Sequence, residues 1–135
     1  MEYLTTETII WLHEEVINVN ELQGIATHKS IDAIVDRVIN RINYGLINDV
    51  FDLAACYAVY IAVGYAFNDA NKRTAFASMN TVLAINDIYL SYETEEAGNM
   101  IINAVLGNID EQDISKWLRK KYNNAEINTK IINNT

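Results

Sequence analysis

The sequence predicts an all-α domain, a compact bundle of about six helices. The chain has no proline and only five glycines in 135 residues, so few residues interrupt a helix. Apolar residues also recur every three or four positions over most of the chain, as on the buried face of a helix. We expect a single domain over residues 1–123, long enough for a hydrophobic core, and a flexible C-terminal tail over residues 124–135.

The first two helices are predicted from capping residues and apolar spacing. One helix covers about residues 6–18, with Thr5 or Thr6 as its N-cap and Glu7 in its first turn. A loop follows, and Ser30 caps the second helix. The apolar positions of this second helix recur at helical spacing and are Ile31, Ile34, Val35, Val38, Ile39 and Ile42.

The third helix is expected at the centre of the fold. Asp49 caps it, and residues 50–63 are apolar nearly all round, which is typical of a helix buried on every side. Cys56, the one cysteine of the chain, lies in this run. We interpret it as a buried small side chain rather than a reactive thiol.

Three more helices complete the predicted bundle. The fourth covers about residues 70–86, with Asn68 or Asp69 at its cap. Residues 88–92 alternate between apolar and polar and predict a short extended piece. The last two helices are expected over about residues 93–106 and about residues 113–122.

Composition argues against two classes of protein. The net charge of −8 and the pI near 4.6 disfavour a protein that binds nucleic acid directly. No apolar run is long enough to cross a membrane, and the first residues lack the basic start of a signal peptide, so we expect a cytoplasmic protein. Of the two histidines, His13 is expected to be packed against the core and His28 to lie in an exposed loop.

The stretch GYAFNDANKRTA, residues 64–75, concentrates polar side chains between two apolar runs. It opens the fourth predicted helix, where free N–H groups and the helix dipole favour anions. An amide, a point charge and a planar guanidinium in the first turn suit phosphate oxygens. Asp69 beside them suits Mg²⁺, which takes one or two carboxylates together with phosphate oxygens. We therefore expect a nucleotide-phosphate site formed by Asn68, Asn71, Lys72 and Arg73.

A structural interpretation of the same stretch stays open from the residues alone. Asn-Asp is a common helix cap, and an adjacent Lys-Arg pair usually lies on a solvated face. The glycines of a Walker loop are missing.

The whole stretch resembles the signature of the Fic/Doc family, His-x-Phe-x-(Asp/Glu)-(Gly/Ala)-Asn-(Gly/Lys)-Arg. Its second half, residues 70–75, resembles the Doc (death-on-curing) branch. Every position matches except the first, where Tyr65 stands in place of histidine. Leu12-His13, the loop around Gly24 and the turn near residue 86 are also similar, so the resemblance covers about residues 5–122.

The resemblance implies an all-α fold that transfers part of a nucleoside triphosphate to a protein hydroxyl. For the Doc branch it implies the toxin of a toxin–antitoxin pair, partnered by a Phd-type antitoxin. Such a toxin is a kinase that uses ATP and Mg²⁺, phosphorylates a threonine of translation elongation factor Tu and halts translation. A Fic-type AMP transferase and a non-catalytic binding domain on the same scaffold are the alternatives. Lys72 favours the Doc branch, because the AMP-transferring branch usually has glycine there.

Tyr65 occupies the place of the general base that the resemblance implies, and Asp69, Lys72 and Arg73 are the other implied catalytic residues. Histidine ordinarily titrates near pH 6.5 and tyrosine near pH 10, so a phenol donates a proton at neutral pH. We expect base catalysis to fall by roughly 10²–10⁴-fold while phosphate and Mg²⁺ binding survive. Tyr65 is either the natural residue of a degenerate binder or a replacement that disarms a toxin. The intact remainder of the motif favours the second.

Overall fold

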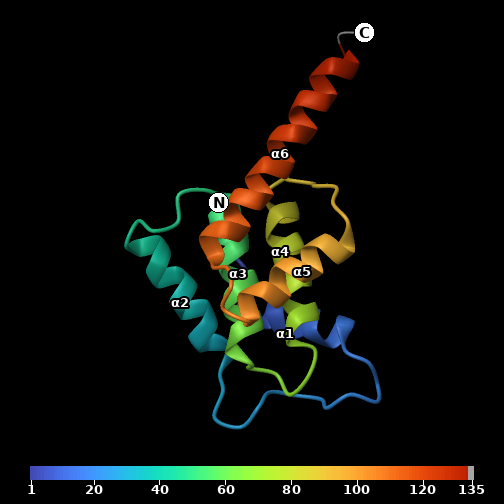
Figure 1. Cartoon of the computed structure of the whole chain (residues 1–135). Helices are drawn as coiled ribbons and strands as arrows, with labels where there is room; N and C mark the ends of the chain where they lie inside the picture. The colour runs from blue at the N-terminus through green and yellow to red at the C-terminus, as the bar shows by residue number, and fades with distance from the viewer. Residues whose placement is uncertain (134–135) are drawn as a thin grey trace.

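A computed structural model describes residues 1–133 of the chain, and it confirms the all-α class (Figure 1). The described part contains six helices. They are α1 (Thr6–Val16), α2 (Ile31–Asn43), α3 (Val50–Gly64), α4 (Asn71–Ile85), α5 (Thr94–Val105) and α6 (Glu111–Asn133).

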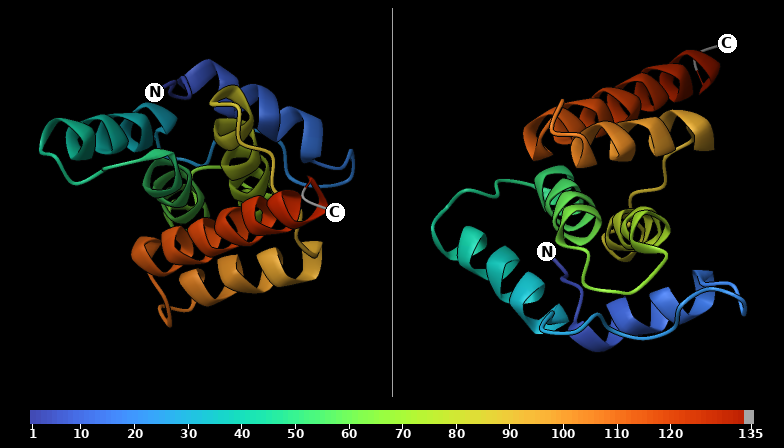
Figure 2. Two further views of the ribbon diagram at one scale, coloured as in Figure 1. Left: turned by 90° about the horizontal axis from the view of Figure 1, so that it is seen from above. Right: turned by 60° about the horizontal axis from the view of Figure 1, so that its bottom comes forward.

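The helices form three layers around α3 and α4. Figure 2 shows these two helices side by side in the middle, with α1 and α2 on one side and α5 and α6 on the other. Every residue of α3 from Leu53 to Ala62 is buried, as the all-round apolar pattern predicts. Cys56 is among them, and burial raises the pKa of its thiol to about 11, so the thiolate is not available for chemistry.

Three of the predicted caps are confirmed. The Thr5 hydroxyl accepts from the backbone N–H of Thr8 at 3.1 Å, and Ser30 and Asp49 accept in the same way at the starts of α2 and α3. These helices begin where the capping residues predict, because a side-chain oxygen satisfies one N–H that the helix itself cannot.

The predicted cap of α4 is wrong. The N-cap residue is Ala70, and no side chain caps the helix. The Asp69 carboxylate instead accepts from the backbone N–H of Leu22, and the Asn68 amide donates to the backbone oxygen of Gln23. Both side chains are drawn to the loop between α1 and α2, so the first turn of α4 stays uncapped.

Two further boundaries differ from the prediction. Residues 88–92 form no strand in the described structure, where the one β-bridge joins Ile25 and Phe67. Helix α6 continues to Asn133 rather than ending near Tyr122, and Figure 1 shows it projecting beyond the other helices. It runs through most of the segment predicted as a loose tail, and the domain boundary at residue 123 stays a prediction. Within the described residues, no helix has both the length and the apolar character needed to cross a membrane.

Candidate active site

The polar stretch singled out in the sequence forms the turn between the two central helices. Residues 65–70, here called the motif loop, link the end of α3 to the start of α4. The turn is closed by two residues in the left-handed region, Tyr65 with φ 49° and Ala70 with φ 65°. Residues other than glycine, asparagine and aspartate rarely adopt this conformation, so the surrounding contacts must hold the loop in place.

Asn71 holds the motif loop from inside. Its side-chain oxygen accepts from the backbone N–H of Phe67 at 3.0 Å, and its amide donates to the Phe67 carbonyl at 2.9 Å. The side chain is buried and clamps the loop, and its predicted contact with phosphate stays a prediction. Since no side chain caps α4, the backbone N–H groups of its first turn are the donors that face an incoming anion.

The segment of residues 18–29, between α1 and α2, holds the motif loop from outside. The backbone N–H of Ala26 donates to Ala66 at 2.7 Å, and that of Asn68 donates to Gly24 at 3.0 Å. Gly24 has φ 87°, a conformation that glycine adopts without a steric penalty. Asn68 contributes its backbone and one amide N–H to this contact, so it positions the loop, and its role in phosphate binding stays a prediction.

His13 supports the motif loop from α1. Its ring is only 3 % exposed and lies parallel to Phe67, with 3.8 Å between ring centroids. Nε2 lies 2.9 Å from the backbone oxygen of Asp69, and since a carbonyl only accepts, Nε2 carries the hydrogen. The expectation of a packed histidine is confirmed. Sequence reasoning missed its contact with Asp69, which lies 56 positions away in the chain.

Asp69 is the one motif carboxylate that could hold a metal ion. One of its oxygens accepts from the backbone N–H of Leu22 at 2.9 Å, and no donor in the described chain bonds the other. The described residues contain no cluster of three or more histidine, cysteine or carboxylate side chains that could hold a metal. A single carboxylate fits Mg²⁺ that is held chiefly by phosphate oxygens and water, and does not fit a metal bound by protein alone.

The two cations of the motif stretch are placed differently. The Arg73 guanidinium forms an ion pair with Glu21 and donates to the Val16 carbonyl at 2.9 Å. The hydrogen bond from Arg73 lowers the pKa of Glu21, and the same bond raises the pKa of Arg73. Lys72 is exposed and forms no ion pair with a described residue, so it is the cation ready to meet an anion. No sequence signal identified Glu21, because the pairing depends on how the 18–29 segment folds back.

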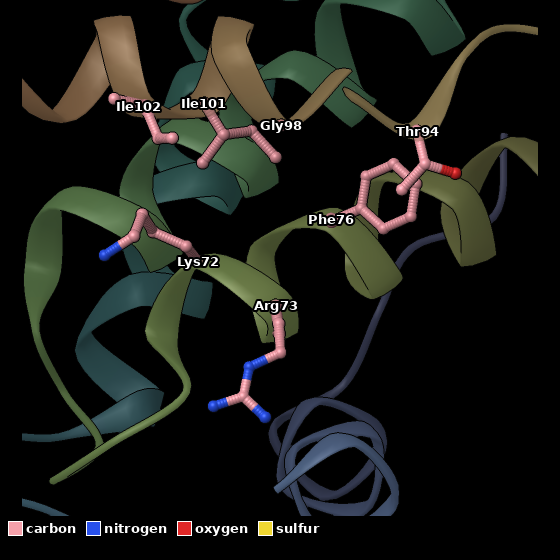
Figure 3. A pocket seen from close by; sticks show the side chains of 7 residues that line it. All are labelled: Lys72, Arg73, Phe76, Thr94, Gly98, Ile101 and Ile102. Atoms are coloured by element: carbon pink, nitrogen blue, oxygen red, sulfur yellow. The ribbon is translucent and has the colours of Figure 1, made fainter. Parts of the chain in front are cut away.

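A pocket of about 180 Å³ opens between α4 and α5 beside these cations. Figure 3 shows Gly98, Ile101 and Ile102 of α5 across from Phe76 and Lys72 of α4, whereas the Arg73 guanidinium points away from α5 toward α1. The walls are apolar and the exposed Lys72 lies beside them, an arrangement that suits a flat apolar group joined to an anion. Sequence reasoning placed no part of α5 at the site.

Comparison of the sequence with known proteins shows the family of the chain. The family model described as Fic/DOC family matches residues 3–83. A relative from Escherichia phage P1, named Protein kinase doc, is 34 % identical over 127 residues, which cover 93 % of this chain and all of that protein. A family match over more than half of the chain and a relative aligned over nearly its whole length lead to one conclusion: the chain belongs to the Fic/Doc family.

Proposed function

We propose that the chain is a Doc-type protein kinase and the toxin of a toxin–antitoxin pair, and that Tyr65 disables its catalysis. The likeness to Protein kinase doc over nearly the whole chain is the observation that carries the proposal. The uncapped start of α4, with Lys72 free beside it, supports phosphate binding at the motif stretch.

In this proposal ATP lies between Lys72 and the pocket of α4 and α5. The apolar walls formed by Phe76, Ile101 and Ile102 fit the face of the base, and Lys72 and the first N–H groups of α4 fit phosphate oxygens. Asp69 would hold Mg²⁺ through its free oxygen, and the ion neutralises charge on the transferred phosphoryl group when bound. Arg73 joins the phosphates only if it leaves Glu21.

The reaction moves one phosphoryl group. The acceptor threonine oxygen bonds to the γ-phosphorus while the bond between that phosphorus and the ADP oxygen breaks, and the threonine proton passes to a base. Tyr65 is half exposed at the end of α3, at the place where the family motif has histidine. Tyrosine is not suited to general-base catalysis at neutral pH as histidine is, so we expect a loss of roughly 10²–10⁴-fold.

We further propose translation elongation factor Tu as the phosphorylated protein and a Phd-type antitoxin as the partner. Both follow from the resemblance to the Doc branch. An AMP transferase is disfavoured because the AMP-transferring branch that the motif resembles usually has glycine at the place of Lys72. Labelled ATP separates the two reactions, since label transferred from the γ position supports a kinase and label from the α position an AMP transferase.

Growth arrest on induced expression tests the proposal. The chain and its Tyr65→His variant are expressed without antitoxin. We expect only Tyr65→His to stop growth, by restoring a base of suitable pKa. If neither stops growth, the toxin proposal fails and a binding domain on the same scaffold is favoured. If both do, the account of Tyr65 is wrong.

A further inference from the structure

A second hollow lies between α2 and α3 and shares no residue with the pocket of α4 and α5. It has a volume of about 440 Å³. Gly64 and Ala66, the two neighbours of Tyr65, are among its lining residues. We call this hollow the basic groove, because its polar lining includes His28, Lys29 and Arg37.

The basic groove gathers positive charge on an acidic protein. The chain has 18 acidic and 10 basic residues, yet no described carboxylate lines the groove. Lys29 and Arg37 are exposed, and neither forms an ion pair with a described residue. All three other arginines of the chain and one lysine form ion pairs with carboxylates, namely Arg41, Arg73, Arg119 and Lys121. The groove therefore contains two positive charges that no carboxylate of the described chain neutralises.

The Arg37 guanidinium and the backbone of Lys29 are held in place before any ligand arrives. The Arg37 guanidinium carbon lies 3.8 Å from the ring centroid of Tyr60, a buried side chain whose hydroxyl donates to Glu111. Stacking on a ring fixes the plane of a guanidinium and leaves its N–H edges free for a carboxylate. Lys29 lies in a turn closed by its own N–H bond to Ala26, which is in turn bonded to the motif loop.

We propose that the basic groove binds an acidic segment of the protein that receives the phosphate, adjacent to its acceptor hydroxyl. The inference rests on the proposed kinase function and supplies its acceptor side. A peptide lying in the groove runs toward Gly64 and Ala66 and presents its next residues at Tyr65, the place of the base. The nucleotide is left to the opposite pocket, between α4 and α5. Arg37 suits a two-point contact with a carboxylate, and Lys29 adds a point charge.

Peptide binding to the unmodified chain tests the groove without any need for catalysis. The probes are two labelled threonine peptides, one flanked by glutamates and the other by lysines, followed by fluorescence anisotropy. We expect the acidic peptide to bind more tightly, although the net charge of −8 would favour the basic one. Arg37→Glu and Lys29→Glu should each weaken the acidic peptide by about tenfold or more.

Lys120→Glu is the matched control, because it makes the same charge change at an exposed position of α6 outside the groove. If it weakens the peptide as much as Arg37→Glu does, or if the basic peptide binds more tightly, the groove proposal is overturned. ATP binding, measured by calorimetry on the same variants, should not change. Failure of peptide binding with ATP binding intact overturns the groove alone. Failure of ATP binding overturns the kinase proposal, and the acceptor role of the groove with it.

Discussion

The polar side chains near the two ends of α3 differ in how completely they are paired. At its start, Arg119 donates to Asp49 at 2.8 Å, and Asp52 accepts from Ser115 at 2.5 Å. At its other end, the uncapped first turn of α4 and the unpaired Lys72 face outward. A cluster that satisfies its own charges stabilises the fold, whereas charges left unmatched at a helix start can bind a ligand. The two ends of α3 therefore differ in how many of their charged side chains have a partner, and not in how many charged side chains they have.

Replacing His13 is expected to have the largest effect on stability, and it tests how strongly the motif loop is held in place. His13→Ala deletes a buried ring stacked on Phe67 and the donor to Asp69. The free energy of unfolding should fall by about 3 kcal/mol, measured by urea denaturation. His13→Phe keeps a ring but leaves the Asp69 carbonyl unpaired, and should lose about 1–2 kcal/mol. Equal loss in both variants would contradict the role assigned to stacking.

Lys72→Ala tests whether the unpaired cation near the end of α3 binds phosphate, in contrast to the paired Arg119 at its start. ATP affinity should fall by about 10–100-fold, since a charge-assisted contact with phosphate is lost, while stability changes little. Calorimetric titration with ATP and Mg²⁺ measures the ATP affinity. Arg119→Ala is the control at the other end of α3, where stability should fall and ATP affinity stay the same. Unchanged ATP affinity in Lys72→Ala would place the phosphates elsewhere.

Low pH should weaken the ion pairs and hydrogen bonds at the start of α3. Burial raises the pKa of the Asp52 carboxyl, but hydrogen bonds from Ser115 and Asn48 together with Arg119 outweigh it and hold that pKa below its ordinary value. A carboxyl with a lowered folded pKa adds stability above about pH 4, and this stability is lost as the pH falls through the folded pKa.

Asp52→Asn should therefore be less stable than the unmodified chain by about 1–2 kcal/mol at pH 7, and the gap should narrow below about pH 4. Denaturant midpoints across this range measure the gap. A gap that stays constant down to low pH would show that charge at Asp52 does not matter.

Glu21→Gln has the smallest expected effect on stability, and it removes the charged partner of Arg73. The ion pair with Arg73 is solvent-exposed, so little stability is lost. Arg73 becomes free for phosphate, and ATP should bind more tightly to the variant. Glu15→Gln, a change of equal charge at another exposed position of α1, should leave ATP affinity unchanged. Weaker ATP binding in Glu21→Gln would mean that Glu21 supports the site instead of occupying its arginine.

Some features were predictable because they are local. Thr5, Ser30 and Asp49 cap helices through bonds to residues three positions away, and such bonds can be inferred from neighbouring residues. Asn68 and Asp69 do not act as caps because their partners are not local. Their partners, Gln23 and Leu22, lie more than forty positions earlier, and a local rule does not include them.

The sequence by itself determined the helical class, the burial of α3 and the stretch of residues 64–75 that carries the family motif. These follow from periodicity and short-range spacing, which act within a few turns of chain. Only the tertiary structure decided that His13 holds Asp69, that Glu21 occupies Arg73 and that Lys29 and Arg37 flank one groove. The first two depend on packing between segments distant in sequence, and the groove depends on the packing of residues 28–37 against the end of α3, which no local pattern specifies.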